Sequence, residues 1–158
     1  MIWPWLDLLF SRLGPTKFVI RLEKGDDILP SLRRFAAENR IGAGVFEGIG
    51  SLNTVKLGHY DFRTKDYKFE VFSEDLEILS LSGNIATMDE APLPHAHVTL
   101  GKRDFSVIGG HLDEGSLANM VEIGLSSLPG KLVKSRDDEV GLNLLQLRRR
   151  LNQAARKS

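Results

Sequence analysis

The amino-acid sequence predicts a single compact α+β domain, built mainly from an antiparallel sheet with one principal helix. Its 158 residues are enough for one domain with its own core. Most of the chain consists of short runs of β-branched and aromatic residues, and these runs are separated by turn-forming residues. One segment, residues 27–39, instead repeats its apolar residues at helical spacing and has start and stop signals.

The first expected elements are a strand and this helix. Residues 17–23 alternate apolar and charged side chains, which is typical of a half-buried strand. Gly25 then favours a turn, and Asp26 is expected to be the N-cap of the helix. Asn39 supplies the stop signal. The sequence therefore predicts a strand followed directly by the principal helix.

The remaining segments are predicted to be strands. Periodicity leaves residues 117–125 open, because this run fits a strand or a helix equally well. Turns are expected at residues 50–51, 63–66, 73–75, 89–94 and 101–104. The expected strands span residues 44–49, 54–62, 67–72, 76–85, 95–100, 105–112, 131–135 and 142–147.

Two short segments flank the predicted domain of residues 15–147. Residues 1–14 form an apolar arm that lacks a basic start and a cleavage site, so it does not fit a signal peptide. The arm is also too short to span a membrane, and Trp3, Trp5, Leu6 and Leu9 are expected to pack on this protein or a partner subunit. The chain has no cysteine, which excludes disulfides and thiolate metal sites, and we expect a cytoplasmic protein.

Charge is distributed unevenly along a chain whose formal net charge is zero. Residues 15–147 contain 15 Lys/Arg and 20 Asp/Glu, a net charge of −5. The basic tail, residues 148–158, contains five basic residues and no acidic one. We expect this tail to be the solvent-exposed end of a helix. An acidic body repels a phosphate backbone, so the charge argues against direct binding of DNA.

Three of the four histidines lie within 17 residues, in the segment PHAHVTLGKRDFSVIGGHLDEG at residues 94–115. On a strand His95 and His97 project from the same face. If residues 105–112 return as a hairpin with Leu100 opposite Ser106, then His95 lies opposite His111, with Cβ atoms roughly 4.5–5.5 Å apart. A slip of one residue would move His111 to the other face, so the prediction depends on the register.

Three neutral imidazoles match zinc best, with nickel, iron and manganese as alternatives. Three protein ligands leave one coordination position open for water or a small ligand. Glu114 and Glu122 are candidates for a fourth ligand, a hydrogen-bond partner that orients an imidazole, or a general base. The alternative is an ordinary solvent-facing or hydrogen-bonding role for these histidines.

Other motifs indicate structure rather than chemistry. His59 stands apart from the other histidines, which favours a surface or packing role. The glycine-rich residues 42–50 lack the Lys-Ser/Thr of a phosphate loop, so sheet bends or close subunit packing are expected there. Ser80, Ser82 and Ser116 lack the sequence context of a catalytic serine.

Six segments of the chain form an ordered set: residues 21–27 (RLEKGDD), 48–52 (GIGSL), 77–86 (EILSLSGNIA), 94–100 (PHAHVTL), 109–112 (GGHL) and 141–142 (GL). This set resembles the PPC family, the "plants and prokaryotes conserved" domain, and extends over residues 17–147. The resemblance implies a compact α+β fold assembled as a homotrimer. It also implies that His95, His97 and His111 correspond to the histidine cluster of bacterial members, where metal binding is expected, and that Glu122 matches an acidic position.

The family is associated with DNA binding, but this sequence lacks part of what that association rests on. Plant members join the domain to AT-hooks, whereas this chain has no Arg-Gly-Arg-Pro hook. The leading hypothesis is a trimeric metal-binding domain whose tri-histidine site binds or transforms a small ligand. The alternatives are a trimeric regulatory or interaction module, and a hydrolase or lyase with Glu122 or Glu114 as base.

Overall fold

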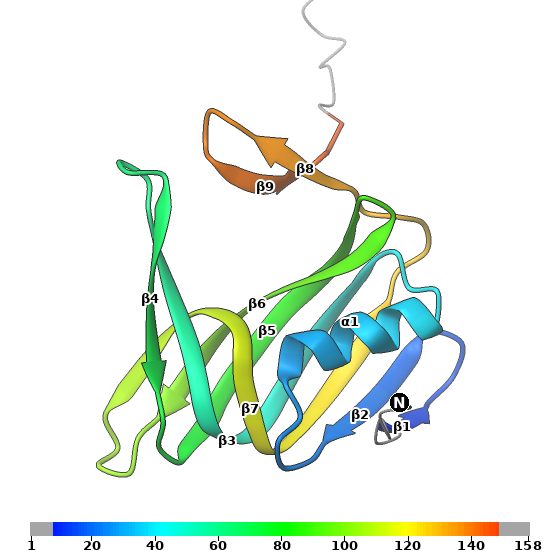
Figure 1. Ribbon diagram of the computed structural model, residues 1–158. Coiled ribbons are helices and arrows are strands. Elements are labelled where there is room, and N and C mark those ends of the chain that lie inside the picture. Colours follow the sequence, from blue (N-terminus) through cyan, green and yellow to red (C-terminus); the bar gives the residue numbers. More distant parts are fainter. Residues whose placement is uncertain (1–7, 149–158) are drawn as a thin grey trace, which may run out of the picture.

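A computed structural model describes residues 8–148 of the chain. Within that range one helix packs against a large antiparallel sheet, and a two-stranded sheet lies at one end (Figure 1). The predicted α+β class with one principal helix is therefore confirmed. The elements are β1 (Leu9–Arg12), β2 (Lys17–Leu22), α1 (Ile28–Glu38), β3 (Gly44–Asp61), β4 (Asp66–Phe72), β5 (Leu76–Met88), β6 (Ala91–Gly101), β7 (Val107–Ser127), β8 (Lys134–Asp137) and β9 (Leu142–Leu145).

Helix α1 begins one residue later than the sequence predicts. The N-cap is Asp27 rather than Asp26, and its side chain makes no capping hydrogen bond. The Asp27 carboxylate instead accepts a hydrogen bond from the Gly115 amide, which ties the start of the helix to β7. Asn39 is the C-cap as predicted. One side of the helix is buried against the sheet, through Ile28, Leu29, Leu32, Phe35 and Ala36.

The predicted turn at residues 50–51 is wrong, because β3 runs through it as one long, bent strand. The bend lies at a register shift between Gly48 and Gly50. Gly50 has φ 138°, and a Cβ there would lie 2.1 Å from the carbonyl oxygen of Met120. Glycine therefore lets β3 cross β7 closely without a chain reversal. Residues 117–125, which periodicity left open, belong to strand β7.

The large sheet closes on itself through its two longest strands. Strand β3 pairs with β5 and β7, and β6 also pairs with β5 and β7. Strands β2 and β1 extend the sheet beyond β7, and β4 extends it beyond β3. Strand β7 pairs with β6 only as far as His111 and then continues along β3. The histidine segment therefore lies where two neighbouring strands part.

The turn between β5 and β6 is much shorter than the predicted residues 89–94. Only Asp89 and Glu90 lie between the strands, with φ values of 48° and 63°. Two successive left-handed residues form the tight turn that suits an antiparallel hairpin. Strand β6 therefore begins at Ala91, and His95 and His97 lie in its middle rather than at its start.

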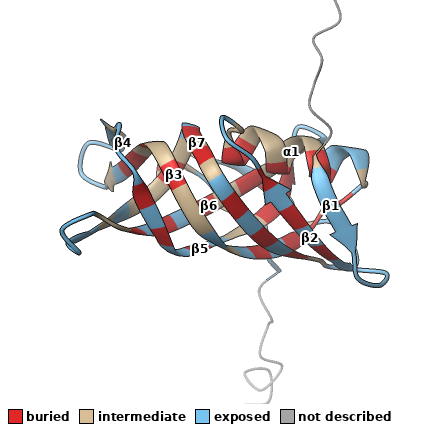
Figure 2. Ribbon diagram, turned by 90° about the horizontal axis from the view of Figure 1, so that it is seen from below, coloured by how far each residue is buried: buried red, intermediate tan, exposed pale blue. Residues whose placement is uncertain are grey.

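The outer surface of the sheet carries a group of exposed apolar side chains. Along β2, β3, β5 and β7 exposed residues alternate with buried ones (Figure 2). We call the exposed group formed by Val19, Val45, Ile49 and Leu79 the outer patch; Ile49 is 60% exposed. Isolated exposed apolar residues are common, but a group on one surface is typical of an interaction site.

The two predicted closing strands pair with each other rather than joining the large sheet. They are shorter than expected, as strands β8 and β9. Two contacts fasten them to the β3–β4 hairpin: the Tyr60 hydroxyl donates a hydrogen bond to the Val140 carbonyl at 2.7 Å, and Lys65 Nζ donates one to the Asp138 carbonyl at 3.3 Å. These contacts place the small sheet over one end of the molecule.

The two flanking segments are described only in part. Residues 9–12 of the expected apolar arm form strand β1, which pairs with β2, and Leu9 is 43% exposed. Trp3, Trp5 and Leu6 lie outside the described residues, as does the basic tail after Arg148. No helix within residues 8–148 combines the length and the apolar character needed to cross a membrane.

Candidate metal centre

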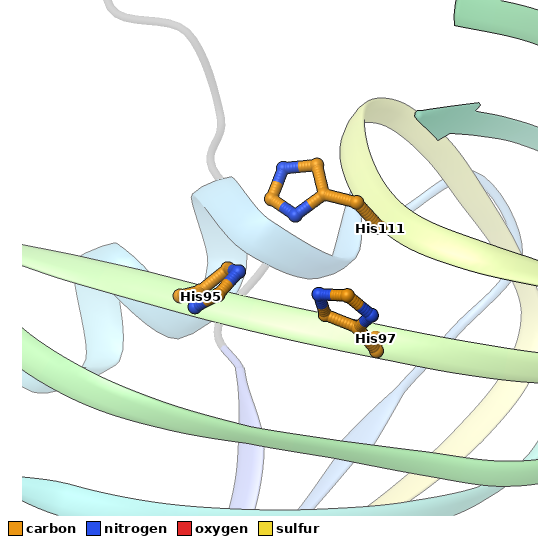
Figure 3. Close-up of side chains that lie close together, drawn as sticks. All are labelled: His95, His97 and His111. Carbon is orange, nitrogen blue, oxygen red and sulfur yellow. The ribbon is translucent and has the colours of Figure 1, made fainter. Parts of the chain in front are cut away.

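Neighbouring strands bring the three predicted histidines together. His95 and His97 lie on β6, where they alternate with the buried Pro94, Ala96 and Val98. His111 lies on β7 directly opposite His97. Because the side-chain period of a strand is two, all three imidazoles project from the same face. Figure 3 shows the three rings converging on one point.

The three rings form a nearly equilateral triangle. Their centroids are 5.3 Å apart for His95 and His97, 5.0 Å for His95 and His111, and 5.6 Å for His97 and His111. One nitrogen of each ring lies within 4.8 Å of the other two. Nitrogens that share one tetrahedral zinc ion at about 2.0–2.1 Å are about 3.4 Å apart. Small rotations of the imidazoles would therefore let them hold a common ion.

The register that brings them together differs from the predicted one by two residues. His97, not His95, lies opposite His111, and Gly109 lies opposite Thr99. The hairpin loop comprises residues 102–106, between the end of β6 and the start of β7. Within it Asp104 accepts hydrogen bonds from the Ser106 amide and hydroxyl. A shift of two keeps each side chain on its face, so the cluster survives the error. A Cβ at Gly109 would lie 2.6 Å from the Val98 carbonyl oxygen, so glycine there lets β6 and β7 approach closely.

Burial keeps two of the imidazoles in the neutral form that binds metals. Desolvation, followed by the nearby charges of Lys134, His111 and His97, lowers the pKa of His95 to about 4. Burial also lowers the pKa of His111. His111 Nδ1 is buried and has no hydrogen-bond partner among the described residues. The donor set therefore fits a divalent cation, which would supply the partner that this nitrogen lacks.

A cavity of about 440 Å³ adjoins His95 and His111. It lies between α1, the β3–β4 hairpin, the two histidine strands and the small β8–β9 sheet. Part of its wall is apolar, from Leu29, Leu93, Pro94, Leu142 and Leu144, and its basic residues are Arg33, Lys65, Lys134 and Arg136. A volume of this size accommodates a small organic molecule.

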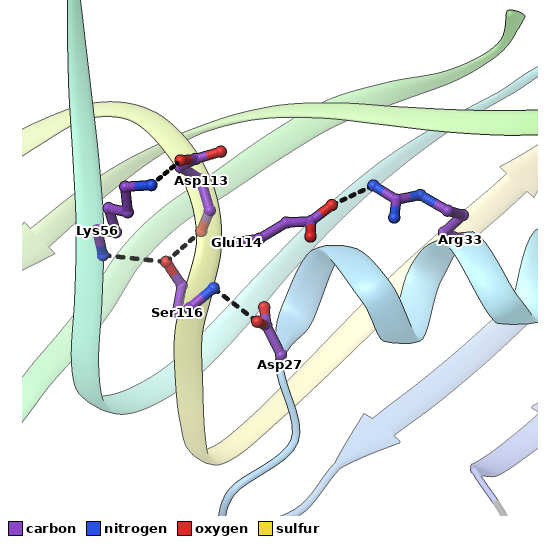
Figure 4. Close-up of polar contacts among 7 residues, drawn as sticks. Asp27, Arg33, Lys56, Asp113, Glu114 and Ser116 are labelled. Atoms are coloured by element: carbon purple, nitrogen blue, oxygen red, sulfur yellow. Dashed lines mark hydrogen bonds and ion pairs between the residues drawn. The ribbon is translucent and has the colours of Figure 1, made fainter. Parts of the chain in front are cut away.

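Glu114 lines this cavity, but its carboxylate is already engaged. It forms an ion pair with Arg33 of α1 (Figure 4). Its neighbour Asp113, which sequence reasoning missed, pairs with Lys56 at 2.5 Å. The negative charge of Asp113 opposes the lowering of the His111 pKa. The signal for Asp113 was its place two residues after His111, on the same face of a strand.

Glu122 lies apart from the histidines within a single chain. It is on β7 opposite Ile49 and beside Arg21 of β2, and it lines a hollow on the outer patch rather than the cavity. The structure therefore does not bring together the three histidines and both predicted glutamates. His59 is exposed on β3 and is not part of the cluster; its neighbour Gly58 pairs with His111, so the side chain of His59 projects from the opposite face of the strand.

Ser116 has a structural role. Its buried hydroxyl donates a hydrogen bond to the Asp113 carbonyl at 2.7 Å and accepts one from the Lys56 amide at 3.1 Å (Figure 4). These bonds hold the bend of β7 against β3, and they occupy the hydroxyl both as donor and as acceptor. A nucleophilic serine needs a base as its partner, and this one has backbone groups instead.

The fold and the site define a small α+β domain with a cluster of three histidines beside a cavity. The chain belongs to the Plants and Prokaryotes Conserved domain family, whose model matches residues 11–129, which confirms the predicted resemblance. Lys134 and the β8–β9 sheet lie beyond the matched residues. Among the curated proteins compared with the chain, none matched.

Several solved structures resemble the chain closely. A metal-containing protein from Archaeoglobus fulgidus is 34% identical with a TM-score of 0.80, covering 88% of this chain and 99% of its own. A plant- and prokaryote-conserved protein from Pyrococcus horikoshii is 29% identical with a TM-score of 0.80, covering 94% and 99%. A protein from Bacteroides thetaiotaomicron, named for a suggested DNA-binding role, is 28% identical with a TM-score of 0.84, covering 88% and 96%.

Proposed function

We propose that this protein binds one divalent metal ion through His95, His97 and His111, and that the ion binds a small ligand in the adjoining cavity. The observation that carries the proposal is the convergence of one nitrogen from each ring to within 4.8 Å. Zinc fits three neutral imidazoles best, with nickel, iron and manganese as alternatives. The metal-containing relative from Archaeoglobus fulgidus supports the same reading.

The arrangement favours a ligand-binding ion over a purely structural one. A structural zinc site normally has four protein ligands, whereas three leave a position open. Two carboxylates of the adjoining cavity, on Asp113 and Glu114, are paired with Lys56 and Arg33. A bound ion would supply a Lewis acid that polarises an oxygen of the ligand. The cavity beside His95 and His111 gives that ligand room.

Metal analysis of protein purified without a histidine tag tests this proposal. Plasma mass spectrometry should find close to one ion per chain in the wild type, and His97→Ala should lose it. His59→Ala is the matched control, because it removes an exposed histidine outside the cluster and should keep the metal. A wild type without metal, even after incubation with zinc at neutral pH, would contradict the proposal.

A second candidate role is that of a regulatory or interaction module, which the outer patch favours. The family resemblance implies a homotrimer, and we further propose that the chain assembles as one through this patch. The relative named for a suggested DNA-binding role points to a nucleic-acid partner. The net charge of −5 over residues 15–147 opposes direct contact with a phosphate backbone. A protein partner therefore fits this second role better.

A further inference from the structure

Lys134 is a buried basic residue beside the histidines. It begins strand β8, lines the cavity and is only 7% exposed. His95 and His111 line the same cavity, so Lys134 shares a wall with two of the proposed metal ligands.

The described part of the chain gives this ammonium group no ion pair and no hydrogen bond. The acidic residues of the cavity already have other partners. Glu114 pairs with Arg33, Asp113 pairs with Lys56, and Asp66 accepts a hydrogen bond from the Tyr67 amide. A buried charge without a partner is strongly unfavourable, and burial accordingly lowers the pKa of Lys134. A bound anion would provide the missing partner.

We propose that the cavity binds a small monocarboxylate, whose carboxylate group lies between the Lys134 ammonium and the metal held by His95, His97 and His111. This inference rests on the proposed function, since it names the class of ligand for that metal. The carbon skeleton of the ligand would pack on Leu93, Leu142 and Leu144. The proposal explains why a lysine is buried in a wall that is otherwise partly apolar.

The charges of the cavity favour one carboxylate over a phosphate. Phosphate recognition generally uses several donors, often arginine side chains that bind two oxygens at once. Arg33 is held by Glu114, and the exposed Arg136 lies near Asp138 at 3.9 Å. Lys134 is thus the one buried cation of the cavity wall among residues 8–148. Beside the metal, one buried ammonium group and apolar neighbours offer few donors, which suits the two oxygens of a carboxylate better than the four oxygens of a phosphate.

Binding of isobutyrate to the cobalt-loaded full-length protein tests the inference. Cobalt(II) binds imidazole sites and reports a change of ligand through its visible absorption spectrum. The titration compares wild type with Lys134→Met and uses neutral isobutyramide and inorganic phosphate as reference probes. Lys68→Met is the matched control, because Lys68 is an exposed lysine of β4 that does not line the cavity. Cobalt content and thermal unfolding are measured for every variant, and Lys134→Gln replaces Lys134→Met if the latter does not fold.

Isobutyrate should bind the wild type and Lys68→Met alike, and should bind the Lys134 variant about tenfold more weakly, with unchanged cobalt content. Isobutyramide should bind weakly and without regard to Lys134. Equal isobutyrate binding by wild type and the Lys134 variant, or none by the cobalt-loaded wild type, would overturn the inference and leave the metal proposal standing. Tighter, Lys134-dependent binding of phosphate would overturn the monocarboxylate class. A wild type that takes up no cobalt would overturn both proposals.

Discussion

At the scale of single residues, burial determines the chemistry of the site. His95 and His111 are held neutral at pH values where a solvent-exposed histidine begins to take up a proton, so their lone pairs are available to a metal. Lys134 adds a positive charge beside them and strengthens this effect. The same burial that prepares the imidazoles for a cation leaves Lys134 in need of an anion. Both requirements are met by a metal ion with an anionic ligand.

The shifted pKa of His95 predicts how the stability of the metal-free protein depends on pH. In the unfolded chain His95 has its ordinary pKa of 6.5, and in the folded chain about 4. Between these values only the unfolded chain gains a proton, so the stabilisation is present above pH 6.5 and lost as the pH falls towards 4. Because His95 is only partly buried, solvent screening limits this loss of unfolding free energy to on the order of 2 kcal/mol.

Urea unfolding of metal-free protein at several pH values measures this loss. His95→Gln should reduce the difference in unfolding free energy between pH 7 and pH 4.5 relative to the wild type. His59→Gln, at an exposed position, should leave the pH dependence of the wild type unchanged. A His95→Gln protein with the same pH dependence as the wild type would show that burial of His95 does not shift its titration.

At the scale of elements, the side-chain alternation of strands was predictable, and so were some chain reversals, such as residues 73–75 between β4 and β5, but not all of them. The predicted histidine hairpin was wrong in register by two residues, yet the face of His111 was right, because faces depend only on parity. Gly50 and Pro94 suggested turns to sequence reasoning, since glycine and proline commonly occur there. In the structure both lie inside strands, because contacts with distant segments decide how such residues are used. Lys134 could not be predicted as a site residue, because it lines the cavity beside the histidines only through the packing of the β8–β9 sheet.

The close crossing of β3 and β7 predicts that Gly50 cannot be replaced. In Gly50→Ala the new Cβ would meet the Met120 carbonyl oxygen at 2.1 Å, with φ at 138°. Alanine disfavours this backbone conformation and the oxygen belongs to the backbone, so the unfolding free energy should fall by about 3 kcal/mol. Gly124→Ala on β7 is the control, since nothing lies within 4 Å of its Cβ position. Chemical denaturation checks both variants, and equal stabilities would mean that the strands separate easily at this crossing.

At the scale of the whole molecule, the site is assembled from segments far apart in the sequence. The helix, the β3–β4 hairpin, the histidine strands and the β8–β9 sheet each contribute part of the cavity wall. The Tyr60 and Lys65 contacts with β8–β9 join two of these walls. The family model ends at residue 129, and the sequence beyond it supplies the wall of the cavity that includes Lys134. Under the proposed binding mode, the choice of ligand depends on this part of the chain.

The outer patch predicts where copies of the chain meet. Ile49, at 60% exposed, lies opposite Glu122, and Glu47 and Glu122 line the same hollow as Val19 and Leu79. In Ile49→Glu a third carboxylate would join this hollow, and its burial between copies would be strongly unfavourable. Sedimentation equilibrium should give the wild type three times the chain mass of 17.6 kDa and give Ile49→Glu the mass of one chain. Phe105→Glu changes a residue that is 92% exposed in the β6–β7 loop and should remain trimeric. A monomeric wild type would contradict the homotrimer, and a trimeric Ile49→Glu protein would place the interface on another surface.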